Sequence, residues 1–178
     1  MCKIIAISNR LICPYDFKER IKEINDLGID IILREKDLDE YSYKKLFKEL
    51  CCPHVIPHSF TLKNRVHLPL NILREKDFSG FDISTSVHSV DEAREAQELG
   101  ARLLIAGHIF ETDCKYGLAG RGLGFIGDIK NAVDIPVFAI GGITKDNAKD
   151  VIKAGADGIC IMSGFMKCSN VKEFLKGF

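Results

Sequence analysis

The sequence has no long hydrophobic run and no excess of charge of either sign. No apolar stretch approaches the roughly 18 residues that can cross a bilayer, and the first ten residues lack the hydrophobic region of a signal peptide. The 25 basic and 25 acidic side chains give a formal net charge of zero, without the basic footprint of nucleic-acid or membrane binding. We therefore expect a cytoplasmic protein that binds a small molecule, with no nucleic acid and no membrane partner; a homo-oligomer remains open.

Paired cysteines are also lacking. Seven cysteines are an odd number, and no two of them form a Cys-x-x-Cys motif, which argues against a disulfide framework and a zinc ribbon. Most are expected to be reduced thiols. Cys114 differs because Lys115 beside it could lower the pKa of the thiol.

The chain has the length and composition of one globular domain spanning residues 1–178. It is 46% hydrophobic and 28% charged, which suits a chain with a sizeable core. Short runs rich in Ile, Val and Leu alternate with amphipathic segments and predict eight strands: Lys3–Ser8, Asp30–Arg34, Val55–His58, Val66–Leu68, Asp82–Val87, Arg102–Ala106, Val137–Ile140 and Gly158–Met162.

Helical periodicity fills most of the intervals. Predicted helices cover Phe17–Leu27, Leu38–Leu50 and Val90–Leu99, the last with a capping box of Ser89 and Glu92. Thr144 is expected to cap a further helix over Lys145–Ala154. Eight strand-helix units favour a compact (β/α)8 TIM barrel of the α/β class, and a flavodoxin-like open sheet is the alternative. Because 178 residues are few for this fold, the third and fourth units must be short and the third helix can be absent.

Glycines end the last two predicted strands. Gly141 and Gly142 follow the seventh strand, and Met162, Ser163 and Gly164 follow the eighth. In TIM barrels the loops after these strands often bind phosphate through backbone N–H groups. These residues therefore predict a site for a small phosphorylated ligand.

The segment after the sixth strand, residues 107–122, is rich in ionisable side chains. It contains His108, Glu111, Asp113, Lys115 and Arg121, together with four glycines. Catalytic residues of a TIM barrel lie on the loops at this end of the strands. Arg34 and Lys36, after the second strand, belong to the same end.

Four segments resemble the superfamily of thiamine phosphate synthase and its relative TenI, the thiazole tautomerase. They are Leu33–Leu38, Ser86–Ser89, Phe110–Lys115, and Ala139–Ile143 with Gly155–Gly158. The synthase pattern has a Gln, an Asn-Asp pair and an Asp where this chain has Ile32, His58-Ser59 and Ile72. The synthase aspartates hold Mg²⁺, which needs hard oxygen ligands, so no metal is expected here. The sixth loop, with His108, resembles the TenI version.

The resemblance implies a cofactor-free thiazole tautomerase of thiamine biosynthesis. Its substrate would be an exocyclic carboxythiazole phosphate, and His108 would move the proton because an imidazole titrates near neutral pH. Lys115, Arg34 and Lys36 are candidates for binding the substrate carboxylate, and Ser86 for a hydrogen bond to the ligand.

Several alternatives remain open at this stage. Cys114 could act as a nucleophile beside Lys115, the chain could be a regulator that binds thiazole phosphate without turnover, or it could retain synthase activity. His88 is expected to serve helix entry, His67 belongs to a backbone motif shared with the synthases, and His58 can line the pocket. The spacing of these histidines does not favour a zinc site.

Overall fold

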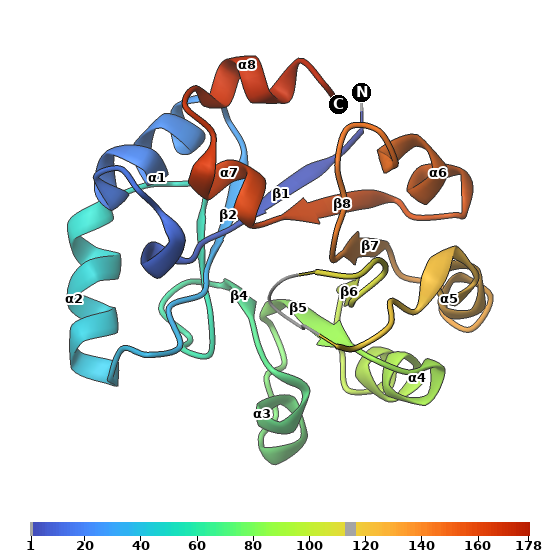
Figure 1. The fold of residues 1–178 in the computed structure, drawn as a ribbon. Coiled ribbons are helices and arrows are strands. Elements are labelled where there is room, and N and C mark those ends of the chain that lie inside the picture. The colour runs from blue at the N-terminus through green and yellow to red at the C-terminus, as the bar shows by residue number, and fades with distance from the viewer. Residues whose placement is uncertain (1, 113–116) are drawn as a thin grey trace.

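Eight parallel strands form a nearly closed barrel, as predicted (Figure 1). The computed structural model describes residues 2–112 and 117–178. Seven of the junctions between neighbouring strands are parallel ladders, in the order β3-β2-β1-β8-β7-β6-β5-β4. The strands are β1 Ile4–Ile7, β2 Asp30–Leu33, β3 Val55–Pro57, β4 Arg65–His67, β5 Asp82–Val87, β6 Leu103–Ala106, β7 Val137–Ile140 and β8 Gly158–Ile161.

Helices surround the ring of strands on its outside (Figure 1). Each α1 to α6 helix follows a strand and returns the chain to the other end of the barrel, as a parallel sheet requires. They are α1 Phe17–Asp26, α2 Glu40–Leu50, α3 Leu70–Glu75, α4 Val90–Glu98, α5 Gly122–Lys130 and α6 Ala148–Lys153, with the short η1 Arg10–Ile12, α7 Ser163–Lys167 and α8 Val171–Leu175.

Two predicted helix starts have different outcomes. The cap by Ser89 before α4 is confirmed, since the Glu92 N–H donates to the Ser89 hydroxyl at 3.0 Å. The return contact of the predicted capping box is shifted by one residue, because the Glu92 carboxylate accepts from the His88 N–H. The prediction that Thr144 caps a helix over Lys145–Ala154 is wrong, because α6 begins only at Ala148. The side chain of Asn147 accepts a hydrogen bond from the Thr144 N–H at 2.8 Å and donates one to the Gly142 carbonyl at 2.9 Å. This contact fixes a turn over the residues that were expected to start the helix.

The helix of the third strand-helix unit, expected between β3 and β4, is absent, as the chain length suggested; α3 is the helix that follows β4. Residues 58–64 connect β3 to β4 without a helix. Lys63 lies where that connection passes the start of β3, and its ammonium donates to the carbonyls of Cys52, Pro53 and Val55 at 3.0–3.1 Å. One side chain thus satisfies three backbone carbonyls at a place where no helix covers the barrel.

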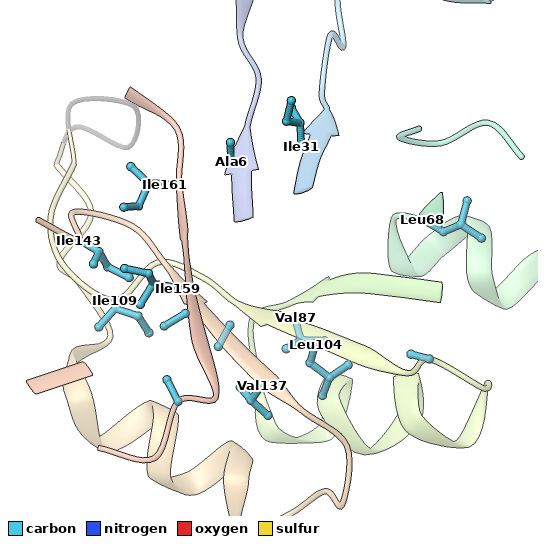
Figure 2. Packing of buried hydrophobic residues seen from close by; sticks show 14 of the residues in the cluster. Ala6, Ile31, Leu68, Val87, Leu104, Ile109, Val137, Ile143, Ile159 and Ile161 are labelled. Atoms are coloured by element: carbon cyan, nitrogen blue, oxygen red, sulfur yellow. The ribbon is translucent and has the colours of Figure 1, made fainter. Parts of the chain in front are cut away.

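Alternating residues of the strands build two apolar cores. One set lies between the sheet and the helices; Figure 2 labels several of its members, among them Leu104 on β6 and Val137 on β7, which are register partners. The smaller set fills the barrel interior and consists of Ile5, Ile7, Ile32, Ile56, Ile105, Phe138 and Cys160. Because side chains alternate along a strand, this division tells which residues at the strand ends face the barrel axis.

One junction of the barrel differs from the other seven. Among the described residues, β3 and β4 share no ladder and are joined by a single parallel bridge between His58 and His67. The Ser59 N–H donates to the His67 carbonyl at 2.9 Å. We call this junction the seam.

None of the helices in the described part of the chain has the length and apolarity needed to span a membrane.

Candidate active site at the barrel mouth

The carboxyl ends of the strands form a mouth with a polar and an apolar half. Side chains alternate between the two faces of a strand, so residues an even number of positions from an interior residue also face the barrel axis. At the ends of β2 to β5 these residues are Arg34, His58, His67 and Ser86. The other half, after β7 and β8, presents Ile140 and Met162, which pack against the interior cluster. A ligand in this mouth therefore meets hydrogen-bonding groups on one side and hydrocarbon on the other.

The two histidines of the polar half lie against each other. Their rings stack with centroids 5.5 Å apart. Nδ1 of His67 lies 3.0 Å from the Ser84 hydroxyl and Nε2 lies 3.1 Å from the Ser86 hydroxyl, so both ring nitrogens have partners. Nδ1 of His58 lies 2.7 Å from the Ser59 hydroxyl.

Both rings are held neutral. Burial, and then the positive charges of Lys36 and Arg34, lower the pKa of His58 to about 4. Burial lowers the pKa of His67 to about 3, with further contributions from His58, Arg34 and Lys36. The two cations that act on the histidines, Arg34 and Lys36, are the residues of the loop after β2 that were predicted to bind the ligand.

The carboxylates of the same loop are engaged elsewhere. Glu35 is buried and accepts hydrogen bonds from the Ser8 hydroxyl at 2.5 Å and from the Arg10 N–H at 3.0 Å. Asp37 pairs with the Arg10 guanidinium. Both carboxylates of residues 34–37 thus contact residues of the segment after β1.

A cavity of about 330 Å³ opens at the seam. It lies where the third helix is missing, and we call it the seam cavity. Its lining combines hydrogen-bonding side chains with Leu38, Phe60 and Pro69. The polar members are Glu35, Lys36, Tyr43, His58, Ser59 and Asn71.

The glycines after β7 adopt conformations that other residues rarely take. Gly141 and Gly142 have φ values of 110° and 64°. A Cβ on Gly141 would lie 2.8 Å from the His108 Cβ, and a Cβ on Gly142 would lie 2.7 Å from the Glu111 carbonyl oxygen. The predicted phosphate loop therefore packs directly on the loop after β6.

A second cavity, of about 370 Å³, lies beside the last two loops. It brings Ser163 and Gly164 together with Thr144 and Lys145, and Phe174 and Phe178 close it from the C-terminal side. Gly141, Gly142 and Met162 do not line it. The residues predicted to bind phosphate are thus neighbours along one rim, but they do not share one cavity.

His108 is buried under its own loop. The N–H groups of Ile109 and Phe110 donate to the carbonyls of Ile140 and Gly141 at 3.0 Å, which extends the pairing of β6 and β7 past the strand ends. Nε2 of His108 lies 3.3 Å from the Leu118 carbonyl. Its Nδ1 is buried and has no hydrogen-bond partner among residues 2–112 and 117–178, which is uncommon for a buried polar atom.

Three other predictions from sequence concern residues of these loops. Lys115 and Cys114 lie outside the described residues. His88 serves helix entry as expected, since its N–H donates to the Glu92 carboxylate at 2.6 Å at the start of α4. Among the described residues, no group of three or more His, Cys, Asp or Glu side chains could hold a metal ion.

Sequence analysis missed part of the polar half. Ser84 contacts His67, and its position two residues before Ser86 on one strand was a signal that both face the axis. Tyr43 and Asn71 line the seam cavity, but they come from helices whose orientation toward the mouth has no local signature.

Comparisons with known proteins agree with this architecture. A family described as thiamine monophosphate synthase matches residues 64–165. The thiamine-phosphate synthase of Clostridium acetobutylicum is 32% identical over 190 residues, which cover 96% of this chain and 90% of that protein. The thiamine-phosphate synthase of Pyrococcus furiosus is 45% identical over 91 residues, covering 51% of this chain and 44% of the relative.

Solved structures extend the likeness to the whole barrel. The thiamine phosphate pyrophosphorylase of Pyrococcus furiosus superposes with a TM-score of 0.77 at 28% identity, covering 99% of this chain and 93% of that one. The match to the family over more than half of the chain and the C. acetobutylicum relative over nearly all of it lead to one conclusion. The chain belongs to the thiamine monophosphate synthase family, whose named relatives are enzymes.

Proposed function

We propose that this protein is a cofactor-independent isomerase that moves a proton on a carboxythiazole phosphate. The single observation that carries the proposal is His108, a buried imidazole on the loop after β6 that backbone hydrogen bonds hold against the glycine loop after β7, and whose Nδ1 has no partner within the described part of the chain. An imidazole in that place can take a proton from one carbon of a phosphate-anchored ring and return it to another.

The proton shift needs no other reactant. His108 removes a proton from the ring, the exocyclic double bond moves into the ring, and the exocyclic carbon receives the proton, which leaves an aromatic thiazole. Arg34 and Lys36 would stabilise negative charge in the delocalised intermediate. Main-chain N–H groups of Gly141, Gly142, Ser163 and Gly164 would hold the phosphate, with Met162 against the ring and Ser86 offering a hydrogen bond; Lys115 is a further candidate for the carboxylate.

The residues of the mouth do not fit the Mg²⁺ that the synthase pattern uses. The ends of β3 and β4 offer His58 and Ser59, and Ile72 lies within α3, packed against the core. Two carboxylates of the loop after β2, Glu35 and Asp37, are bound to Ser8 and Arg10. We therefore derive no step through a divalent cation.

The second candidate is thiamine-phosphate synthase, and a specific observation favours it. The relatives that match over most of the chain carry that name, including those of C. acetobutylicum and Fusobacterium nucleatum, each 32% identical. This activity would join the pyrimidine of a pyrimidine diphosphate to the thiazole phosphate and release the diphosphate. A regulator that binds thiazole phosphate without turnover is the non-enzymatic alternative.

One experiment separates these functions. The purified protein is incubated with the exocyclic carboxythiazole phosphate in D₂O, and aromatisation and deuterium uptake are followed by NMR; a parallel reaction contains the pyrimidine diphosphate and Mg²⁺. We expect metal-independent aromatisation, and we expect His108→Gln to slow it about 10²–10⁴-fold, the usual contribution of a general acid-base group.

The matched control is Cys114→Ser, which tests the thiol as the reacting group on the same loop. A Cys114→Ser variant that loses activity while His108→Gln keeps it would overturn the assignment. Mg²⁺-dependent consumption of the pyrimidine diphosphate would establish the synthase. Tight binding of the thiazole phosphate without any turnover would establish the non-enzymatic regulator.

A further inference from the structure

We propose that Arg20 is a positioning residue for the rim after β8, where Ser163 and Gly164 are expected to hold the ligand phosphate. Arg20 belongs to α1, and its guanidinium holds the end of α7, the helix that carries these two rim residues. Together with Glu23 it forms what we call the α1 clamp, which grips the turn between α7 and α8. The proposal rests on the proposed function only in taking this rim as the phosphate site.

The burial of Arg20 is the first argument. Arg20 is 3% exposed, although it lies on a helix outside the ring of strands. Burying a charge costs free energy unless polar groups compensate it, and apolar residues of similar volume often stabilise such a position as well or better. An arginine at this place is therefore explained better by the geometry that it imposes on its partners than by stability alone.

The partners of the guanidinium lie at the end of α7. Nη1 donates to the Phe165 carbonyl at 3.0 Å and to the Cys168 Sγ at 2.9 Å, and Nη2 donates to the Cys168 carbonyl at 2.6 Å. The guanidinium carbon also lies 4.6 Å from the centre of the Tyr15 ring. Because the donors of a guanidinium form a rigid planar fork, these contacts fix the direction in which α7 ends.

Glu23 is the other half of the α1 clamp. One of its oxygens accepts a hydrogen bond from the Val171 N–H at 3.0 Å, where α8 begins. Its other oxygen lies 3.6 Å from Nε of Arg20. The two neighbouring side chains of α1 thus hold the end of one helix and the start of the next, which fixes the turn over residues 168–170.

The clamped helices carry the rim itself. The five-residue α7 begins at Ser163 and is too short to keep its shape through its own hydrogen bonds. A Cβ on Gly164 would overlap the ring of Phe174 on α8, whose centroid lies 5.3 Å from that of Phe165. Ser163, Gly164 and Phe174 all line the cavity of about 370 Å³. A change at the α1 clamp would therefore shift the rim and one wall of this cavity together.

The test compares ligands with and without a phosphate. The aromatic carboxythiazole phosphate and the corresponding alcohol are titrated by isothermal titration calorimetry into the wild type, Arg20→Met and Glu23→Gln. We expect the wild type to prefer the phosphate, because the rim donates to it. The preference should fall at least about tenfold in Arg20→Met, as for the loss of a hydrogen bond to a charged group, and several-fold in Glu23→Gln. The alcohol should bind all three proteins alike.

The matched control is Lys22→Met, which removes a positive charge from an exposed position of the same helix. It should keep the wild-type preference for the phosphate. Glu23→Gln is the milder substitution, since the Glu23 side chain is 40% exposed, and it keeps the test decisive if Arg20→Met does not fold.

Four results would overturn the proposal. They are a wild type without preference for the phosphate, an unchanged preference in Arg20→Met or, if that variant does not fold, in Glu23→Gln, equal weakening of both ligands, and the same loss in Lys22→Met. A merely structural role of Arg20 predicts the equal weakening. His108→Gln is expected to keep the preference, so a failure of the proposed proton transfer, seen as absence of turnover, leaves this measurement unchanged.

Discussion

Tyr43 shows how one side chain can support both the barrel and its mouth. Its hydroxyl donates to the Leu33 carbonyl at 2.7 Å and accepts from the His58 N–H at 2.7 Å, so it ties the end of β2 to the residue after β3. Burial raises the pKa of the phenol, which stays protonated and can donate. The Tyr43 hydroxyl thus holds together two segments that border the seam cavity.

Replacing Tyr43 by Phe is expected to lower the free energy of unfolding by about 1–3 kcal/mol, because a buried N–H and a carbonyl lose their partner. Urea denaturation followed by circular dichroism measures the change. Tyr41→Phe is the control, since Tyr41 is 78% exposed on the same helix, and it should alter stability by less than about 0.5 kcal/mol. Equal effects of the two substitutions would contradict this role of the hydroxyl.

Individual site residues were predictable where the chain marks them locally. The glycines after β7 and β8 and the histidine after β6 indicated which loops form the site. The structure brings two of these loops together, at Gly141 and His108. The burial of His108 under Leu118 was not predictable, because it depends on how a long loop folds back. The pairing of His58 with His67 depends on the register across the seam, which no local pattern encodes.

At the scale of elements, Lys63 compensates for a missing helix. Its ammonium is shared among three carbonyls around the start of β3, and partial burial lowers its pKa. The short connection between β3 and β4 is therefore stabilised by a side chain instead of a layer of packed apolar residues.

Lys63→Met keeps the aliphatic stem and removes the donor. We expect a loss of about 1–3 kcal/mol in the free energy of unfolding, since several partly buried carbonyls lose a charged partner. Lys149→Met, at an exposed position of α6, makes the same change of charge and should cost less than about 0.5 kcal/mol. Urea titrations of both variants measure the difference, and a Lys63→Met protein as stable as the control would refute the interpretation.

Helix boundaries show which local signals suffice. Ser89 and Glu92 cap α4 through contacts within four residues, and this arrangement was predictable from the sequence. At α6 the competing contact from Asn147 to Gly142 reaches back into the glycine loop. That contact delays the helix, and it follows from the loop conformation rather than from helical periodicity.

At the scale of the whole molecule, the two neutral histidines make stability depend on pH. Their native pKa values of about 4 and about 3 lie below the value near 6.5 of an unfolded histidine. At a pH between the native and the unfolded pKa, each of these histidines is protonated in the unfolded chain and neutral in the folded one. The stabilisation is therefore complete above about pH 6.5 and is lost progressively as the pH falls toward 4.

Urea denaturation at about pH 7.5 and about pH 5 tests this dependence, and each histidine should contribute roughly 1.4 kcal/mol per pH unit in the steep region. The double variant His58→Gln/His67→Gln removes both titrating groups. It should lose less stability than the wild type between the two pH values, even if it is less stable at both. An unchanged pH dependence would show that other groups, such as buried Glu35, dominate.

The whole fold was predictable because eight apolar runs separated by helical segments allow few arrangements of a chain this short. The closure of the ring was not predictable, since β3 and β4 meet through one bridge rather than a ladder. Only the assembled barrel shows that the polar half of the mouth and the weakest junction lie at the same place.

That coincidence gives the seam a thermodynamic consequence. Ser59 belongs to the β3 side of the junction and Asn71 to the β4 side, while His58 stacks on His67 across it. A ligand that contacted both sides of the cavity would join two strand edges that share only one backbone bridge among the described residues. Occupancy of the cavity would then be linked to closure of the barrel, and a saturating ligand would raise the cost of opening the ring by the mass-action amount set by its own affinity.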